Sequence, residues 1–165
     1  MNALELLRSM HSDTKFRLKT ILGSGDSAEA HESWQALQPL LEVHERLEDE
    51  YIYAPLADEF GTNTPLGDWV ERHDADVANV ELLIADVDTS KPGSPSWRMA
   101  VGRVTDTLTR HVMDEEGQIF GRIEQAWDAA RLAAIGEEMQ KVLDNSGAQP
   151  AGKRRTRAQA ARGRR

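Results

Sequence analysis

The chain has 165 residues and no cysteine, which excludes disulfide bonds, thiolate metal sites and cysteine nucleophiles. Its 28 acidic and 20 basic residues give a net charge of −8, and its length suits one domain with a sizeable core. No stretch approaches the roughly 18 apolar residues needed to span a bilayer, and the N-terminus lacks the pattern of a signal peptide. We therefore expect a cytoplasmic protein without membrane contact.

The basic charge is concentrated at the C-terminus. Residues 151–165, "AGKRRTRAQAARGRR", contain seven of the 20 Lys and Arg, so 13 basic and 28 acidic residues remain before them. This segment has no apolar side chain larger than alanine, so we expect residues 148–165 to form a disordered tail. The charge of residues 153–165 favours weak contact with nucleic acid, and a solubilising or self-contacting role is an equal alternative.

Apolar residues at helical spacing predict helices separated by three loops, "GSGD" (23–26), "GTNTPLG" (61–67) and "TSKPGSPS" (89–96). The second helix should cover about residues 27–58, with a kink at Pro39, and the fourth should start near Ser96. A fifth, shorter helix is predicted at "DAARLAAIGEEMQKVLDN". Short loops join antiparallel helices, so we expect an all-α, up-down-up-down four-helix bundle with an additional C-terminal helix, within a domain of residues 1–147.

Each of the four long helices contains one histidine that continues its apolar stripe. Glu48 follows the histidine of the second helix and Glu115 that of the fourth, each at i+4, so imidazole and carboxylate share one helix face. A fifth histidine, His31, is expected at the surface near the start of the second helix. The four inward-facing histidines are His11, His44, His73 and His111.

A lone histidine on an apolar face is more often a hydrogen-bonded core residue than a metal ligand. The two glutamates change this balance, because a buried carboxylate costs several kcal/mol unless it is paired or bound to a cation. Imidazole and carboxylate together suit iron, manganese or zinc, and two such pairs predict a dimetal site with carboxylate bridges. The Glu-x-x-His pattern of ferritin-like proteins is absent, because the residues three before the histidines are Arg8, Ala28, Leu41, Val70 and Leu108.

Four motifs together resemble the hemerythrin-like, HHE cation-binding domain, in particular the stand-alone proteins of actinobacteria. The motifs are "LLRSMHSDTK", "LEVHERLEDEYIYAPL", "ERHDADV" and "TRHVMDEEGQIF", and the likeness covers roughly residues 3–145. It implies a non-haem di-iron centre, oxo-bridged, with bridging carboxylates from Glu48 and Glu115. The terminal imidazoles implied by the resemblance are those of His11, His44, His73 and His111.

The chain departs from this family's pattern in two places. Oxygen-carrying hemerythrins have His-x-x-x-His on the third helix, where this chain has Val77 in the second position, so one iron lacks an imidazole. Water, Glu45 or Tyr51 could fill the gap. The resemblance also places an acid five residues after the last histidine, which is Glu116, whereas the i+4 choice of Glu115 mirrors the second helix and is preferred.

Three functions remain open. The first is a peroxide-decomposing, catalase-like activity on the di-iron centre, for which no side chain is assigned as the proton carrier. The second is a non-catalytic sensor or store for oxygen, nitric oxide or iron, with the same ligands. The third is a helical interaction protein without metal, whose stability would not respond to iron.

Overall fold

The computed structural model describes residues 1–61 and 64–148, so the predicted basic tail lies, apart from Ala148, outside the described residues. Within the described ranges every regular element is a helix. No helix in this part of the chain has the length and apolar character needed to cross a membrane. The elements are α1 (Ala3–Gly23), α2 (Ser27–Glu48), η1 (Asp49–Tyr53), α3 (Ala54–Phe60), α4 (Pro65–Thr89), α5 (Pro95–Asp114), η2 (Glu115–Ile119), α6 (Phe120–Ala126) and α7 (Ala129–Asn145).

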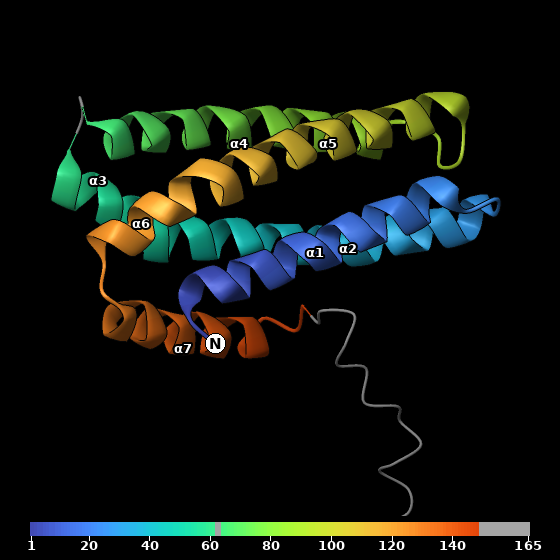
Figure 1. The fold of residues 1–165 in the computed structure, drawn as a ribbon. Helices are drawn as coiled ribbons and strands as arrows, with labels where there is room; N and C mark the ends of the chain where they lie inside the picture. The colour runs from blue at the N-terminus through green and yellow to red at the C-terminus, as the bar shows by residue number, and fades with distance from the viewer. Residues whose placement is uncertain (62–63, 149–165) are drawn as a thin grey trace, which may run out of the picture.

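The helices form a bundle with one extra helix, as the sequence predicts (Figure 1). α1 packs against α2 and α5, and α4 packs against α5. α2 continues through Pro39 into η1 and α3, and α5 continues through η2 into α6, so each makes one long helical run. α7 lies across the outer side of α1, and it also contacts α2.

Local sequence signals determine where the helices begin. Asn2 and Glu5 form a reciprocal capping box at the start of α1, and the Asp26 carboxylate accepts hydrogen bonds from the first backbone amides of α2. α4 and α5 each begin with proline after a threonine or serine cap, at Thr64 and Ser94. These caps satisfy amides that have no partner inside the helix.

The core is filled by aliphatic side chains and by buried tryptophans, including Trp34 and Trp97. His31 is half-buried rather than at the surface, because its ring packs edge-on against Trp97 with centroids 6.5 Å apart. At the contact between α7 and α1, a side chain on Gly136 would lie 2.6 Å from the backbone oxygen of Met1. The absence of a side chain there is what lets α7 approach the start of α1.

One side of the bundle is packed loosely. α4 has few fully buried side chains, and α2 and α4 make little direct contact. The α4 residues Val77, Val80 and Ile84 are only partly buried, although they face a cavity that α2 also lines. The bundle therefore has a groove between α2 and α4, and this groove leads to the buried polar residues described next.

Candidate metal centre

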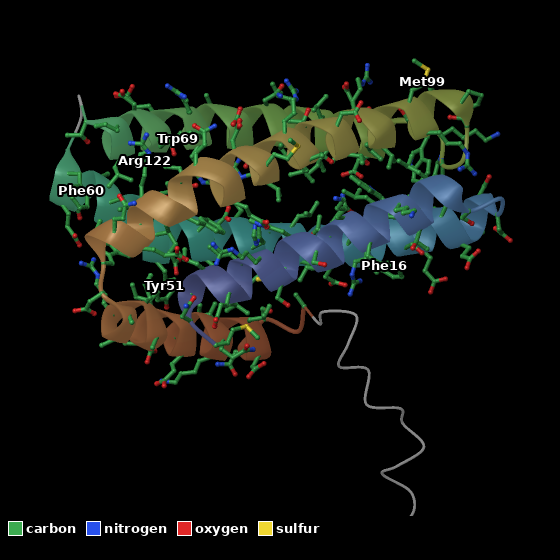
Figure 2. The ribbon with its side chains drawn as sticks, in the orientation of Figure 1. Phe16, Tyr51, Phe60, Trp69, Met99 and Arg122 are labelled. Carbon is green, nitrogen blue, oxygen red and sulfur yellow. The ribbon has the colours of Figure 1, made fainter. Side chains whose placement is uncertain are left out.

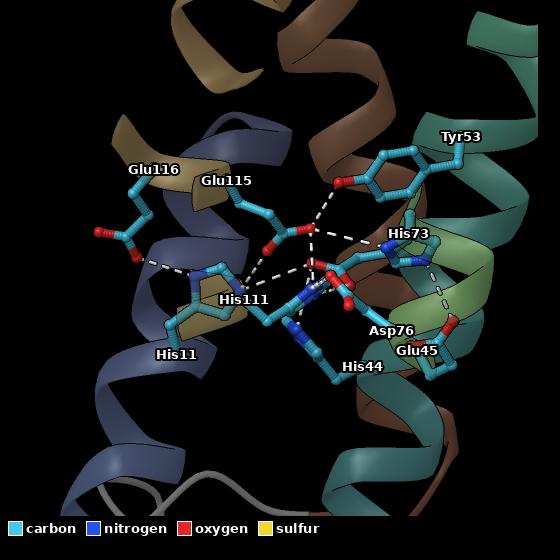
Figure 3. Close-up of polar contacts among 10 residues, drawn as sticks. His11, His44, Glu45, Tyr53, His73, Asp76, His111, Glu115 and Glu116 are labelled. Atoms are coloured by element: carbon cyan, nitrogen blue, oxygen red, sulfur yellow. Dashed lines mark hydrogen bonds and ion pairs between the residues drawn. The ribbon is translucent and has the colours of Figure 1, made fainter. Parts of the chain in front are cut away.

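Six predicted residues meet at the centre of the bundle (Figure 3). Glu48 is fully buried and Glu115 is 1% exposed, which is rare for carboxylates in an apolar core. Ligand atoms of Glu48, His73, His111 and Glu115 lie within 4.8 Å of one another, and so do those of His11, His44 and Glu48. Glu48 belongs to both groups. This is the arrangement expected of a carboxylate shared by two cations.

The distances show how each glutamate contacts several imidazoles. His44 Nε2 lies 3.1 Å from Glu48 Oε1, and His111 Nε2 lies 3.3 Å from Glu115 Oε1. His11 Nε2 lies between both carboxylates, 3.5 Å from Glu48 Oε1 and 3.3 Å from Glu115 Oε2. His73 Nδ1 lies 3.8 Å from Glu115 Oε1. Two ligands bound to one zinc-like ion at about 2.1 Å would be separated by roughly 3 to 3.5 Å, so this spacing suits shared metal ions.

A π-helical turn follows or includes each buried glutamate. η1 begins directly after Glu48, and η2 begins at Glu115. A π turn inserts one extra residue and is frequent at functional sites. Both His-x-x-x-Glu pairs keep i+4 spacing on one face, because each π turn begins only at its glutamate or directly after it. Side chains beyond the extra residue change face, and ordinary helical periodicity does not anticipate this.

The change of face affects the tyrosines. Tyr53, not Tyr51, lies at the site: its hydroxyl donates a 2.5 Å hydrogen bond to Glu115 Oε1, and its ring stacks on His73 with centroids 3.7 Å apart. Tyr51 lies beside α7, on another side of the helix (Figure 2). The structure therefore does not bring Tyr51 to the gap that the sequence analysis considered. Burial, together with the charge of Glu115, raises the pKa of Tyr53 well above its usual value.

Carboxylates outside the centre contact the far nitrogens of three histidines. Glu116 Oε1 lies 2.8 Å from His11 Nδ1, and Glu45 Oε1 lies 3.2 Å from His73 Nε2. Asp76 Oδ2 lies 3.7 Å from His111 Nδ1. Such partners orient metal-binding imidazoles and select their tautomer. The sequence pattern offered Glu116 as an alternative bridge and gave no sign of a role for Asp76, although Asp76 stands one helical turn after His73.

Within residues 1–61 and 64–148, several buried polar atoms of the centre lack a hydrogen-bond partner of good geometry. Both carboxylate oxygens of Glu48 are among them, as are Glu115 Oε2, His11 Nε2 and His73 Nδ1. An unpaired buried polar atom costs about 1–3 kcal/mol, so a cluster of them is unfavourable unless it binds something. Two carboxylates surrounded by four imidazoles are also the donor set that iron, zinc or manganese accept. The residues present therefore fit metal ions.

The buried carboxylates and imidazoles of the centre shift one another's pKa values. Burial alone would raise the pKa of Glu48, but attraction to His44 and contacts with three imidazoles hold it well below the usual range. Burial would lower the pKa of His11, yet its contacts with Glu115 and Glu48 raise it to about 10. The same causes raise the pKa of His111 to about 11. Protonated imidazoles thus balance the two carboxylates, and a bound cation would take over that role.

A cavity of about 140 Å³ opens between α2 and α4 and ends at this centre. Val77, which replaces the histidine expected of an oxygen carrier, is one of its wall residues. Val77 offers no ligand atom to this cavity, and a small molecule in the cavity can approach the centre.

Comparison with known proteins agrees with this geometry. The family model for the hemerythrin HHE cation binding domain matches residues 2–123. The chain belongs to this family. Domains of this family bind metal ions, and the His/Glu groups of this chain are suited to that role. The match ends before α7, so the predicted domain boundary at residue 147 stays a prediction.

A curated relative is a DNA nickase from Nostoc sp. (strain PCC 7120 / SAG 25.82 / UTEX 2576), 23% identical over 123 residues. The alignment covers 74% of this chain but 34% of the nickase, so the chain spans about a third of that relative's length. No solved structure matches the chain.

Proposed function

We propose that the chain holds two non-haem iron ions bridged by Glu48 and Glu115. The observation that supports this best is the fully buried Glu48, which is contacted by imidazoles from α1, α2 and α5 and belongs to both ligand groups. Bound cations would take over from the protonated imidazoles the role of balancing both glutamates, and the two ligand groups could each hold one. The terminal ligands in this proposal are His11, His44, His73 and His111.

We further propose that the centre reacts with small oxygen species and removes hydrogen peroxide in a catalase-like reaction, in which two peroxides give two waters and one dioxygen. A bound pair of irons supplies the two-electron redox chemistry that this reaction needs. The apolar cavity beside Val77 supports access of a small ligand to the centre. The Tyr53 hydroxyl donates a hydrogen bond to Glu115 Oε1 and so holds a proton at this carboxylate.

The alternative is a non-catalytic module that binds oxygen, nitric oxide or iron as a sensor or store. It uses the same ligands and the same cavity, so turnover separates the two functions. We propose no DNA chemistry for this chain, because its similarity to the nickase covers only 34% of that protein. Contact of residues 153–165 with nucleic acid stays a prediction from charge.

The test uses the full chain purified from iron-supplemented cells. We expect two irons per chain, a visible absorption spectrum, and release of dioxygen from peroxide above the level of free iron. Glu48→Ala and His111→Ala should lose all three properties, whereas Glu50→Ala, an exposed acid of η1, should keep them. A metal-loaded protein that changes its spectrum with nitric oxide but releases no dioxygen would favour the non-catalytic module. A metal-free protein would refute the di-iron proposal.

A further inference from the structure

The groove between α2 and α4 combines apolar walls with an acidic rim. Glu42 and Glu81 are exposed at its mouth, and Glu45 and Asp76 are partly buried further in. No lysine or arginine lines it within the described residues. Its walls are formed by Leu41, Val77, Val80, Ile84, Leu108 and Val112.

The opposite groove, between α1 and α5, has a different character. It also reaches His11, but Arg8 and Lys15 line it, together with several hydroxyl side chains. Two openings thus approach the centre from different sides, and in the one between α2 and α4 the exposed charged side chains, Glu42 and Glu81, are both acidic. This asymmetry is a property of the tertiary structure, because the acids involved come from two helices far apart in sequence.

The acidic side chains and the apolar walls of the α2–α4 groove together determine the electrostatic field at its mouth. A cleft lined by one sign of charge, with walls of low dielectric constant, focuses the field and raises the local concentration of counter-ions. The side chains of Glu42 and Glu81 have no hydrogen bond or ion pair within the described part of the chain, so no ion pair there neutralises their charges. The field at the mouth therefore attracts cations and repels anions.

An independent observation identifies a residue at the inner end of the groove that a cation could bind. Glu48 is fully buried, both of its oxygens lack a hydrogen-bond partner of good geometry among the described residues, and it lines the inner end of the same cavity. We propose that the α2–α4 groove is the entrance through which a divalent cation, Fe²⁺ in the cell, reaches the centre. Glu42 and Glu81 act as the outer attracting residues. This inference rests on the proposed metal centre but concerns the route, not the ligands.

The test measures how fast the metal-free full-length protein takes up Co²⁺, whose visible absorption reports binding, by stopped-flow mixing at low salt. The variant is Glu42→Gln/Glu81→Gln. The matched control is Glu32→Gln/Glu71→Gln, which removes the same charge from positions of α2 and α4 that do not line the groove. We expect the association rate constant to fall about tenfold in the variant and less than about twofold in the control.

Two further comparisons separate an effect of charge on the route from damage to the metal centre. Glu42→Asp/Glu81→Asp should keep a rate near that of the wild type, and the difference between variant and control should shrink at high salt because exposed charges are screened. The amount of Co²⁺ bound at saturation should be the same in all proteins. Equal association rates in the variant and the control would contradict the proposed entrance but not the proposed metal centre. Absence of Co²⁺ uptake by the wild type would instead overturn the metal centre, and the entrance with it.

Discussion

The Tyr53 hydroxyl donates a hydrogen bond of 2.5 Å to Glu115 Oε1, and this contact joins η1 to η2 across the centre of the bundle. Both residues belong to π turns, so the two π turns meet at this contact. The pair is nearly inaccessible to solvent, with Tyr53 2% and Glu115 1% exposed. The fold therefore fixes the geometry of this hydrogen bond, and a substitution at Tyr53 tests the structure of the metal centre.

Tyr53→Phe should destabilise the metal-free protein by about 1–3 kcal/mol, because it leaves a buried carboxylate oxygen without its donor. It should also alter the visible spectrum of the iron-loaded protein, whether the phenol contacts iron or only its glutamate ligand. Tyr51→Phe is the matched control, and it should leave the spectrum unchanged. Denaturant unfolding and absorption spectroscopy measure the two effects, and a spectrum that responds to position 51 alone would contradict the structure.

Metal should stabilise the wild type by linkage, by about 2.7 kcal/mol at a free concentration one hundred times its dissociation constant. Glu48→Gln should abolish most of this gain because it removes the shared carboxylate. Glu50→Gln, two residues further along and exposed, should keep it. Thermal unfolding with and without added Fe²⁺ under anaerobic conditions measures the gain. Equal gains in both variants would show that the metal binds elsewhere.

Removal of the outer carboxylates should weaken metal binding without removing a ligand. We expect Glu116→Gln and Asp76→Asn to lower metal affinity about 10- to 100-fold, as is typical for partners of metal-binding histidines. Asp114→Asn, an exposed acid on the same helical run as Glu116, should have little effect. Competition with a chromophoric chelator gives the affinities. Unchanged affinity in Glu116→Gln would mean that its 2.8 Å contact with His11 does not orient the ring.

The stability of the metal-free protein should depend on pH with a definite sign. Its contacts with the two glutamates raise the pKa of His11 to about 10, above the unfolded value near 6.5, despite burial. The contribution of this group to stability is therefore complete below about pH 6.5 and is lost as the pH rises toward 10. Glu48 has a lowered pKa, so its contribution is complete above about pH 4.5 and is lost on acidification.

We therefore expect the metal-free protein to be most stable between about pH 4.5 and 6.5 and to weaken from pH 6.5 to 10. The metal-loaded protein should lose less over the same range, because its imidazoles are neutral ligands already. Urea midpoints at pH 6 and pH 9, with chelator or with metal, measure the difference. A metal-free midpoint that rises between these values would refute the pairing of imidazolium with carboxylate.

Gly136→Ala should destabilise the protein by about 1–3 kcal/mol, because the new methyl group would lie 2.6 Å from Met1 O and 2.7 Å from Ala3 N. The expected loss arises from the contact between α7 and α1 rather than from the metal centre. Gly102→Ala, where a methyl group meets nothing within 4 Å, is the control and should be neutral or stabilising. Denaturant unfolding compares the two variants, and equal stabilities would mean that α7 shifts at little cost.

The sequence alone determined the helices and their order, because capping residues, loops and apolar spacing of 3.6 residues are local signals. It also predicted that His44 and Glu48, and likewise His111 and Glu115, share a helix face, since i+4 spacing within a regular helix fixes this. The structure brings these pairs together at the centre, along with His11 and His73.

The tertiary structure decided what periodicity could not. The π turns moved Tyr53 rather than Tyr51 to the centre, because an extra residue in a turn changes the face of all that follows and leaves no mark in the apolar pattern. The roles of Glu116 and Asp76 as partners of histidines depend on how η2 meets α1 and how α4 meets α5. The acidic groove likewise exists only because α2 and α4 lie side by side without close packing, which distances along the sequence do not encode.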